Sequence, residues 1–249
     1  MGDSINKHKI LGLKRGSYIT APLTSAYSNL YSVEFDGSDD YLVNSGAVPA
    51  IGAGDFSVSF WIYRIADSGA DEYIMFSDAA NDWSIYIRAS DDKLRFAGPW
   101  ADIASVAVAV GAWEHWVFTV DRDDKSKWYK NGSFLDQKTV GSDTTNFNTS
   151  PVAFTIGRDN GSTYNLNSRL DEVSIWDVAL SASNVTALYN SGDPTDLAAE
   201  SFAGNLIHWW RMGDPGGTGS YPTISDVEGS LNMTMTNMTS GDINTNVPT

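Results

Sequence analysis

The segment from 167 to 192, NSRLDEVSIWDVALSASNVTALYNSG, constrains the fold of this chain more than any other stretch. Apolar and polar residues alternate over 168–177, which predicts a β-strand with one buried face. Ser181 follows a short turn and is a suitable helix N-cap, with Val185 and Leu188 spaced to face the rest of the protein. The closing glycine supplies a C-terminal stop. This order of elements predicts a short helix laid against a sheet.

Period-two alternation recurs along the whole chain. In 55–63, DFSVSFWIY, every second residue is a large apolar one. Asn131-Gly132 separates two further alternating runs and is a strong signal for a type I′ hairpin. We therefore predict an all-β fold, an antiparallel β-sandwich of short strands. The other expected strands lie at 30–35, 40–43, 72–77, 83–88, 93–97, 104–110, 126–130, 133–140, 152–157, 206–211 and 231–236.

Two short helices complete the predicted architecture, at 181–190 and 194–200. The second would be capped by Asp193, with Pro194 at its first position. One sandwich is expected over 28–240, preceded by a basic arm at 1–27 and followed by a C-terminal tail at 241–249.

Composition narrows the classes of partner. The chain has 16 basic and 31 acidic residues and a formal net charge of −15. An acidic surface repels nucleic acid phosphates and anionic lipid, so we expect no nucleic acid partner. No apolar run approaches the roughly 18 residues that a membrane span needs, so we expect no membrane insertion. The absence of cysteine excludes a disulfide scaffold.

The basic residues are concentrated at the start of the chain. The first fifteen positions contain four basic residues, Lys7, Lys9, Lys14 and Arg15, and one acidic residue, Asp3. This arm is expected to dock on an acidic partner surface. A flexible leader and an extra strand on the sandwich are the alternatives. The first twenty residues, MGDSINKHKILGLKRGSYIT, contain no apolar signal-peptide core, so we expect no secretory leader in this stretch.

Several segments resemble, in order, the laminin G-like jelly-roll domains of the concanavalin A-like lectin and glucanase class. YSVEFDGSDDYL at 31–42 is similar to the opening hairpin of that family, and DFSVSFWIY to its next strand. WEHWVFTVDRDDKSKWYKNG at 113–132 and the strand–helix segment described above complete the series. The resemblance implies a jelly-roll sandwich that functions in binding.

One strand pair comes later in this chain than in many members of that family. HWWRMGD at 208–214 and ISDVEGSLN at 224–232 follow the predicted helix. We expect Trp209, Trp210 and Arg211 to pair beside the opening strand near 31–35. This late arrangement is similar to laminin G-like proteins of marine bacterial viruses, which implies a virion protein with a capsid or tail partner.

One segment of the chain is a weak candidate for a catalytic site. The resemblance extends to laminarinase-type glucanases, which place carboxylates along one strand, and Glu34-Phe-Asp36-Gly-Ser-Asp39 is a near match. Retaining hydrolysis needs two carboxylates on one face, about 5–5.5 Å apart. Glu34 and Asp36 would share a face, but Gly37 breaks the strand before Asp39. We therefore predict that the chain is not an enzyme and has no catalytic residues.

Calcium is the cofactor that the resemblance implies. Asp171 alternates with Val173 and Ile175, so its carboxylate is expected on an apolar face, where it must be paired or bound to a metal. The opening and closing strands of such sandwiches are neighbours, so Asp36 and Asp171 are the predicted ligands of a structural calcium. The alternative is an Asp171 that accepts hydrogen bonds from the turn after Phe35. The loops with Asp78, Asn81, Asp82, Asp159 and Asn160 form a second candidate set.

Three aromatic residues are candidates for stacking on sugar rings. Trp83, Trp100 and Tyr164 lie in polar loops, NDWS, GPWAD and GSTYN. Packing within the sandwich is the alternative for each of them. Trp61, Trp116, Trp128 and Trp176 lie in strong strands and are expected to pack.

The sequence thus predicts a non-catalytic laminin G-like surface or binding module. We interpret it as a virion structural protein, such as a capsid decoration, head fibre or tail protein, that binds glycans and is displayed on the virion surface. The alternative is an extracellular carbohydrate-binding accessory module or adhesin module of a secreted protein. A glycoside hydrolase is the weakest of the three interpretations.

Overall fold

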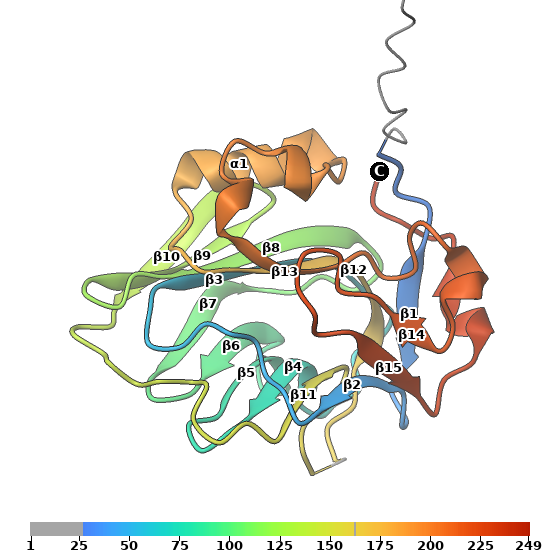
Figure 1. Ribbon diagram of the computed structural model, residues 1–249, viewed down its shortest axis with the longest axis horizontal. Helices are drawn as coiled ribbons and strands as arrows, with labels where there is room; N and C mark the ends of the chain where they lie inside the picture. The colour runs from blue at the N-terminus through green and yellow to red at the C-terminus, as the bar shows by residue number, and fades with distance from the viewer. Residues whose placement is uncertain (1–26, 162) are drawn as a thin grey trace, which may run out of the picture.

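The computed structural model describes residues 27–161 and 163–249. The predicted basic arm, with Lys7, Lys9, Lys14 and Arg15, lies outside the described residues. Two antiparallel sheets of eight strands pack face to face, and one α-helix lies outside them (Figure 1). The predicted antiparallel β-sandwich is confirmed. Within the described part of the chain, no helix has the length and apolar character that crossing a bilayer requires.

The first sheet, sheet A, has the strand order β10-β9-β8-β3-β12-β1-β16, and β13 also pairs with β12. β12 is an interior strand of this sheet, between β3 and β1, and it is almost entirely buried, because the sandwich core covers one face and the helix region the other. The strands of sheet A are β1 (Ser32–Asp36), β3 (Phe56–Arg64), β8 (Trp113–Val120), β9 (Lys125–Lys130), β10 (Ser133–Thr139), β12 (Asn167–Trp176), β13 (Leu206–Trp210) and β16 (Ile243–Asn244).

The second sheet, sheet B, has the order β14-β15-β2-β11-β4-β5-β6-β7. Alternate residues of its strands enter the core, while the others form an outer face that carries aromatic and polar side chains. The strands of sheet B are β2 (Tyr41–Ser45), β4 (Glu72–Asp78), β5 (Trp83–Arg88), β6 (Lys93–Ala97), β7 (Ala101–Ala107), β11 (Ala153–Ile156), β14 (Thr223–Ile224) and β15 (Met233–Thr236).

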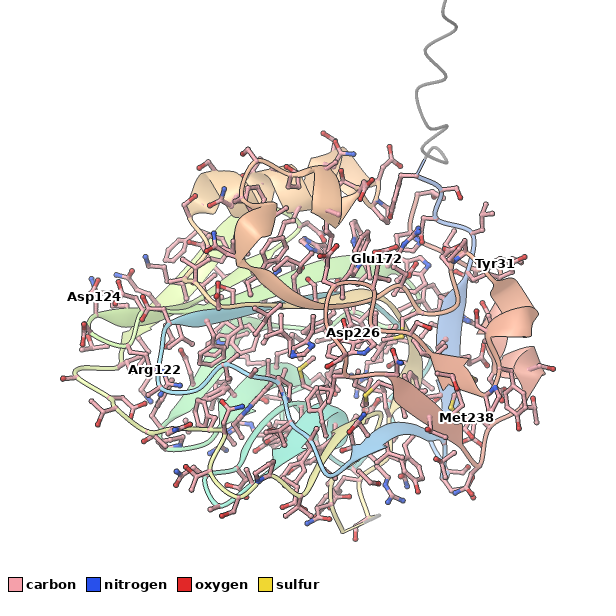
Figure 2. All side chains as sticks on the ribbon, viewed as in Figure 1. Tyr31, Arg122, Asp124, Glu172, Asp226 and Met238 are labelled. Carbon is pink, nitrogen blue, oxygen red and sulfur yellow. The ribbon has the colours of Figure 1, made fainter. Side chains whose placement is uncertain are left out.

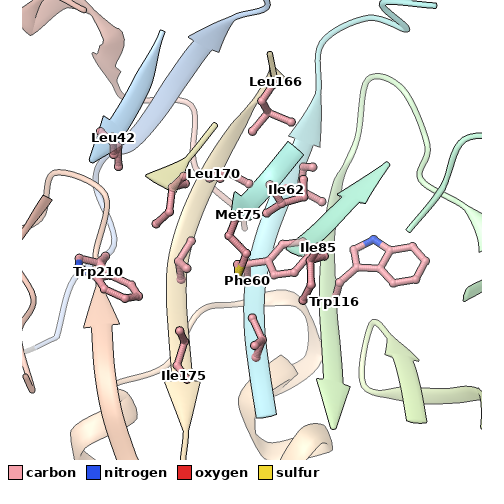
Figure 3. Close-up of a cluster of buried hydrophobic side chains, with 14 of the residues drawn as sticks. Leu42, Phe60, Ile62, Met75, Ile85, Trp116, Leu166, Leu170, Ile175 and Trp210 are labelled. Atoms are coloured by element: carbon pink, nitrogen blue, oxygen red, sulfur yellow. The ribbon is translucent and has the colours of Figure 1, made fainter. Parts of the chain in front are cut away.

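Large apolar side chains from both sheets interdigitate in a single core between them. Figure 3 shows Phe60 of β3 and Trp116 of β8 on sheet A beside Met75 and Ile85 of sheet B. All four are fully buried. Burying a side chain of this size contributes about 1.5–3 kcal/mol, so the alternation seen in the sequence is the main source of stability.

The helix forms where its capping residues predict it. Helix α1 (Ala182–Tyr189) begins after Ser181, whose side chain accepts a hydrogen bond from the Asn184 backbone N–H in a capping box. Its buried Val185 and Leu188 pack on the outer face of sheet A, in a second apolar cluster with Trp176 of β12 (Figure 1). The predicted helix at 181–190 is confirmed.

The predicted second helix is wrong in extent and in its cap. Only a three-residue 3₁₀ turn forms, at Leu197–Ala199, and it is capped by Asp196 rather than Asp193. The Asp196 carboxylate accepts a hydrogen bond from the Ala198 N–H at 3.2 Å. Three residues offer too few backbone hydrogen bonds to extend into an α-helix, whose first turn is costly to form.

The late tryptophan pair joins the sandwich, but beside a different strand from the one expected. β13 pairs with β12, with Val173 opposite Trp210, whereas β1 pairs with the preceding half of β12. Neighbouring side chains of a strand point to opposite faces, so Trp210 enters the main core and Trp209 the cluster beneath α1. The predicted pairing beside 31–35 is therefore wrong, because β12 is long enough to hold β1 and β13 one after the other along one edge.

The hairpin turn predicted at Asn131-Gly132 is confirmed. Asn131 and Gly132 have φ values of 48° and 73°, the left-handed pair that a type I′ hairpin requires.

The stretch 241–249, which we expected to be a C-terminal tail, contains β16 instead. Ile243 of β16 is buried and pairs with Val33 of β1, so this short strand extends sheet A at its edge.

Candidate functional site

A row of aromatic side chains crosses the outer face of sheet B. Tyr73 of β4 is opposite Tyr86 of β5, and Tyr86 is opposite Arg95 of β6. The three side chains therefore stand side by side on the face that points away from the core. We call Tyr164, Tyr73, Tyr86 and Arg95 the aromatic row.

The rings of the aromatic row are almost parallel. Tyr73 and Tyr86 stack with centroids 4.7 Å apart and planes inclined by 7°, and Tyr164 stacks on the other side of Tyr73 at 5.9 Å and 14°. The guanidinium carbon of Arg95 lies 6.0 Å from the Tyr86 centroid, which extends the row by a cation–π contact. Tyr164 ends the row and is 38% exposed, so it is the ring most accessible to a ligand.

The polar groups of the row are hydroxyls and a guanidinium that keep their protons at neutral pH. Burial, followed by the neighbouring Tyr86, raises the pKa of Tyr73 to about 12, so its hydroxyl stays protonated at neutral pH. The Arg95 Nε–H is buried and has no hydrogen-bond partner among the described residues. Apolar ring surface next to polar side chains is a combination that suits a carbohydrate, which has C–H faces and many hydroxyl oxygens.

A hollow of about 270 Å³ adjoins the row. Tyr73 and Phe76 of β4 and Ser84 of β5 line it, and the exposed Asp82 stands at its edge. A second hollow, of about 240 Å³, shares Asp82 with the first and continues over Asn81, Pro99 and Thr145. The aromatic row and these two hollows together form a polar and aromatic surface along β4 and β5.

A larger hollow lies elsewhere, between α1 and the β9–β10 turn, with a volume of about 670 Å³. Asn131, Ser133, Thr186 and Asn190 contribute to its lining, and no charged side chain does. The face of its one aromatic residue, Tyr189, is stacked on Trp61 with centroids 5.8 Å apart. We therefore consider the aromatic row the better candidate site.

The three predicted stacking residues have different positions. Trp83 is 1% exposed and packs among Phe56, Phe96 and Phe147, so a ligand does not reach its ring. The prediction for Trp83 is wrong, because the residue begins β5 and its side chain lies on the inner face of the sheet. Trp100 is partly buried and packs against the core. Tyr164 is exposed and belongs to the aromatic row. Only one of the three predicted residues therefore lies at the candidate site.

The predicted calcium ligands do not lie together. In the pairing of β1 with β12, Asp36 is opposite Asn167, four positions before Asp171. Four strand residues span roughly 13 Å, whereas calcium ligands lie about 2.3–2.6 Å from the ion. One ion therefore cannot bind both Asp36 and Asp171, and the prediction that they share a calcium ion is wrong. The expected alternative partner of Asp171, the turn after Phe35, is excluded by the same register.

Asp36 lies in a small acidic turn of its own. Its carboxylate and those of Asp39 and Asp40 have oxygen atoms within 4.8 Å of one another. Asp36 and Asp39 are exposed, and Asp36 Oδ1 already accepts a hydrogen bond from the Ser38 N–H at 2.8 Å. This geometry is that of a solvated Asx turn.

The second candidate set of calcium ligands is also occupied by hydrogen bonds within the chain. Asn160 donates to Asp78 Oδ2 at 2.9 Å, and Asp159 Oδ1 accepts from the Tyr164 N–H at 3.2 Å. The second of these bonds helps to hold Tyr164 in place at the end of the aromatic row. These loops therefore support the row rather than form a separate acidic cage.

Asp171 lies instead among buried acidic groups. It is fully buried, and its pKa is raised well above the ordinary value by burial and by the neighbouring charges of Glu172 and Asp214. Burial also raises the pKa of Glu172, to about 7, although Arg211 opposes the shift. Asp171 is buried as expected, but its surroundings are acidic and polar rather than apolar, because the register of β12 shifts between Asp171 and Ser174. Its neighbours Asp214 and Asn29 were not predicted, because they come from segments distant in the sequence.

Sequence reasoning also missed most of the aromatic row. Tyr73, Tyr86 and Arg95 lie in three different strands, all of which were predicted. Their alternation in those strands was a usable signal for an outward face. What the sequence did not contain was the register that places Tyr73 opposite Tyr86.

Two antiparallel sheets with this strand order and a helix packed outside sheet A define a concanavalin A-like β-sandwich. A model of the "concanavalin A-like lectin/glucanases superfamily" matches residues 36–186, more than half of the chain, and the chain belongs to this family. No curated protein matches it.

Solved structures show the same fold at low sequence identity. A Bacteroides ovatus protein that has been proposed to bind carbohydrate is 19% identical, with a TM-score of 0.65 over 89% of this chain and 62% of that one. This chain thus spans about three fifths of its length. A heptameric SAP-like pentraxin from Limulus polyphemus is 16% identical, with a TM-score of 0.52 over 65% of this chain and 82% of that one. The binding domain of botulinum neurotoxin serotype D is 18% identical, with a TM-score of 0.49 over 66% and 42%.

Proposed function

We propose that this chain is a non-catalytic carbohydrate-binding module whose site is the aromatic row of sheet B. The observation that carries the proposal is the stacked series Tyr164, Tyr73 and Tyr86, which ends in the cationic side chain of Arg95. An oligosaccharide bound here would place a C–H face on the exposed Tyr164 ring and accept hydrogen bonds from Arg95. The family and the Bacteroides ovatus structure support binding as the general role.

The acidic residues nearest to the glucanase pattern favour binding over hydrolysis. Glu34 forms an ion pair with Arg169 at 2.7 Å and accepts a hydrogen bond from Asn244 at 2.9 Å. The Asp36 carboxylate accepts a hydrogen bond from the Ser38 N–H within its own turn. A general acid must be free to reach its substrate, and the raised pKa that it needs comes from burial or a like charge, not from a cationic partner. The arrangement of Glu34 thus suits a structural role.

The biological setting that we propose is the surface of a virion, with the basic arm docked on an acidic capsid or tail protein. The support is the resemblance of the late strand pair to laminin G-like proteins of marine bacterial viruses, together with the basic charge of the arm within an acidic chain. An extracellular accessory or adhesin module would use the same aromatic row. Reversal of Lys7, Lys9, Lys14 and Arg15 to glutamate distinguishes the two, because it would remove incorporation into particles and leave glycan binding unchanged.

Binding at the aromatic row is tested by screening the full chain on a glycan array and titrating the hits by calorimetry. Aromatic contacts contribute about 0.5–1.5 kcal/mol each, so Tyr164→Ala is expected to weaken binding roughly 2- to 12-fold. Arg95→Met keeps the aliphatic stem and removes the donors, and we expect a similar loss.

Phe134→Ala is the matched control. Phe134 is 52% exposed on β10 of sheet A, and its loss is expected to leave binding unchanged. Equal weakening by Phe134→Ala and Tyr164→Ala would place the site elsewhere. For the non-enzymatic part of the proposal, β-glucans are incubated with the wild type and with Glu34→Gln. Release of reducing ends by the wild type, lost in Glu34→Gln, would refute it.

A further inference from the structure

The hollow between α1 and the β9–β10 turn is separate from the aromatic row. It has a volume of about 670 Å³, within the range of about 300–1,000 Å³ that is usual for small-molecule sites. α1 lies outside sheet A, whereas the aromatic row crosses the outer face of sheet B (Figure 1). The hollow and the row therefore lie on opposite faces of the sandwich.

The lining of the hollow is polar and uncharged. Within the described parts of the chain, no acidic or basic residue contributes to it. In Figure 2 the labelled Arg122, Asp124 and Asp226 all lie away from α1. A lining without charge stands out in a chain whose formal net charge is −15. Most of the lining consists of amide and hydroxyl side chains, those of Asn131, Ser133, Ser183, Thr186, Asn190 and Ser191.

Lys130, the residue before the turn, is directed away from the hollow. Its Nζ forms an ion pair with Glu114 at 2.6 Å and lies 5.1 Å from the ring centroid of Trp116, which belongs to the sandwich core. Among the described residues, a charged ligand in the hollow would thus find no side chain of opposite charge in the lining.

Contacts between the two walls of the hollow fix them relative to each other. The Thr186 hydroxyl of α1 donates to the Gly132 carbonyl at 3.2 Å, and a Cβ added to Gly132 would lie 3.0 Å from the Tyr189 ring. Asn131 Oδ1 accepts a hydrogen bond from the His115 N–H at 2.8 Å, which orients the amide and leaves its NH₂ group as a donor. A ligand would therefore meet groups that are already in place.

The rim of the hollow where α1 ends has an uncommon backbone conformation. Asn190 and Ser191 have φ values of 44° and 63°, both in the left-handed region. Asparagine adopts this region readily at the end of a helix, whereas serine does so seldom. Backbone of this kind persists where the surrounding structure requires it, and it often accompanies a functional site.

A partly exposed aromatic pair follows on the same face of sheet A. Trp61 is opposite His115, and Tyr189 stacks on both of them. Tyr63 is opposite Trp113, two positions away on each strand and therefore on the same face, at roughly 7 Å along the strands. The rings of this second pair have centroids 5.8 Å apart and are half-buried, so they offer some apolar ring surface next to the polar lining.

These features together suit a neutral saccharide. Each sugar hydroxyl both donates and accepts hydrogen bonds, as the hydroxyls and amides of the lining do. An apolar ligand would leave those groups without partners, and an ionised ligand would lose its water without gaining a counter-charge. A sugar ring also has a C–H face that can lie against the aromatic pair of Tyr63 and Trp113.

We propose that the hollow between α1 and the β9–β10 turn is a second saccharide site, which binds a neutral sugar independently of the aromatic row. The proposal shares with the proposed function the general role of carbohydrate binding, but it uses none of the residues of the row. Two sites on opposite faces would allow one chain to bind two glycan strands at once.

The test is NMR titration of the isotope-labelled full chain with neutral trisaccharides of glucose, galactose and mannose. We expect at least one of them to shift the amide signals of Gly132, Ser133 and Ser191. A trisaccharide of glucuronic acid is expected to leave these signals unchanged at the same concentration. Asn131→Asp keeps the acceptor for the His115 N–H and removes the NH₂ donor, so we expect binding to weaken roughly 2- to 12-fold, the factor that corresponds to one hydrogen bond.

Ser133→Trp is the blocking variant. Ser133 is exposed on β10 and lines the hollow, so a bulky ring at this position is expected to fill the hollow and abolish the shifts without disturbing the core. Thr139→Trp, at the other end of the same exposed strand, does not line the hollow and is the matched control. We expect Thr139→Trp and Tyr164→Ala to bind sugar in the hollow like the wild type.

The outcomes separate this proposal from the aromatic row. Shifts confined to Tyr73, Tyr86 and Tyr164 would overturn the second site and leave the proposed function intact. The absence of shifts at the hollow with all three neutral sugars would also overturn the second site, as would equal weakening by Ser133→Trp and Thr139→Trp. Shifts at the hollow that disappear in Tyr164→Ala would refute the independence of the two sites.

Discussion

His115 makes the stability of this protein depend on pH in a way that can be calculated. Its ring is buried on the outer face of sheet A, between Ser59 and the aromatic rings of Trp61 and Tyr189. Nε2 lies 2.8 Å from the Ser59 hydroxyl, but Nδ1 is buried and has no hydrogen-bond partner within 27–161 or 163–249. Protonation would therefore bury a charge without an acceptor, and burial lowers the pKa of His115 to about 3.

The sign of the effect follows from linkage between folding and proton binding. The unfolded chain binds a proton at His115 below about pH 6.5, whereas the folded chain does not until about pH 3. The unfolded state is therefore favoured as the pH falls through this window, by about 1.4 kcal/mol per pH unit. At pH 5 the loss from this residue is about 2 kcal/mol, or roughly 4–8 °C in melting temperature for a domain of this size.

The prediction is tested by urea unfolding of wild type and His115→Gln at pH 7 and pH 5. Glutamine can still hydrogen-bond to Ser59, but it does not titrate. Other groups also titrate in this range, and burial raises the pKa of Asp40 to about 6, which makes the folded state relatively more stable as the pH falls. The difference between wild type and His115→Gln cancels such contributions. We expect that difference to shrink by about 2 kcal/mol between pH 7 and pH 5.

A packing control separates titration from loss of contacts. Trp61 stacks on His115 with centroids 4.9 Å apart, so Trp61→Phe disturbs the same cluster without removing the titrating group. Its effect on the free energy of unfolding is expected to be equal at both pH values. If the difference between wild type and His115→Gln were independent of pH as well, the assignment of a strongly lowered pKa to His115 would be wrong.

Two further predictions concern the fold itself. Truncation after Asn205 removes the buried Trp210 and Met233 from the core, so we expect the remaining chain to be unfolded by circular dichroism; a truncated chain that melts like the full one would contradict the role given to β13 and β15. Gly157→Ala would place a Cβ 2.5 Å from the Phe35 ring at a φ of 97°, and we expect a loss of about 2–5 kcal/mol in urea unfolding. Gly46 has a φ of 95°, and no atom of the described residues lies within 4 Å of an added Cβ, so Gly46→Ala is expected to lower the free energy of unfolding by only about 1 kcal/mol, the backbone contribution; equal losses in both variants would show that the Phe35 contact is unimportant.

The features that could be predicted from the sequence are those that depend on residues close together in the chain. Alternation over a few residues is enough to define a strand and its buried face, as in Phe56–Arg64. The Asn131-Gly132 turn and the Ser181 cap were predicted correctly because each depends on one or two side chains and their own backbone. The antiparallel sandwich followed from these local signals and from a family resemblance that extends along the chain.

The candidate sites were decided by contacts between distant segments. Tyr73 and Tyr86 meet because β4 and β5 pair in one register, and a shift of one residue would turn one ring into the core. The hollow between α1 and the β9–β10 turn forms only because Thr186 of the helix contacts Gly132, from which 54 positions of sequence separate it. Alternation states which face a side chain occupies, but not which residue lies opposite. The strands and their buried faces were therefore determined by the sequence alone, whereas the register of the sheets decided which of their side chains share a site.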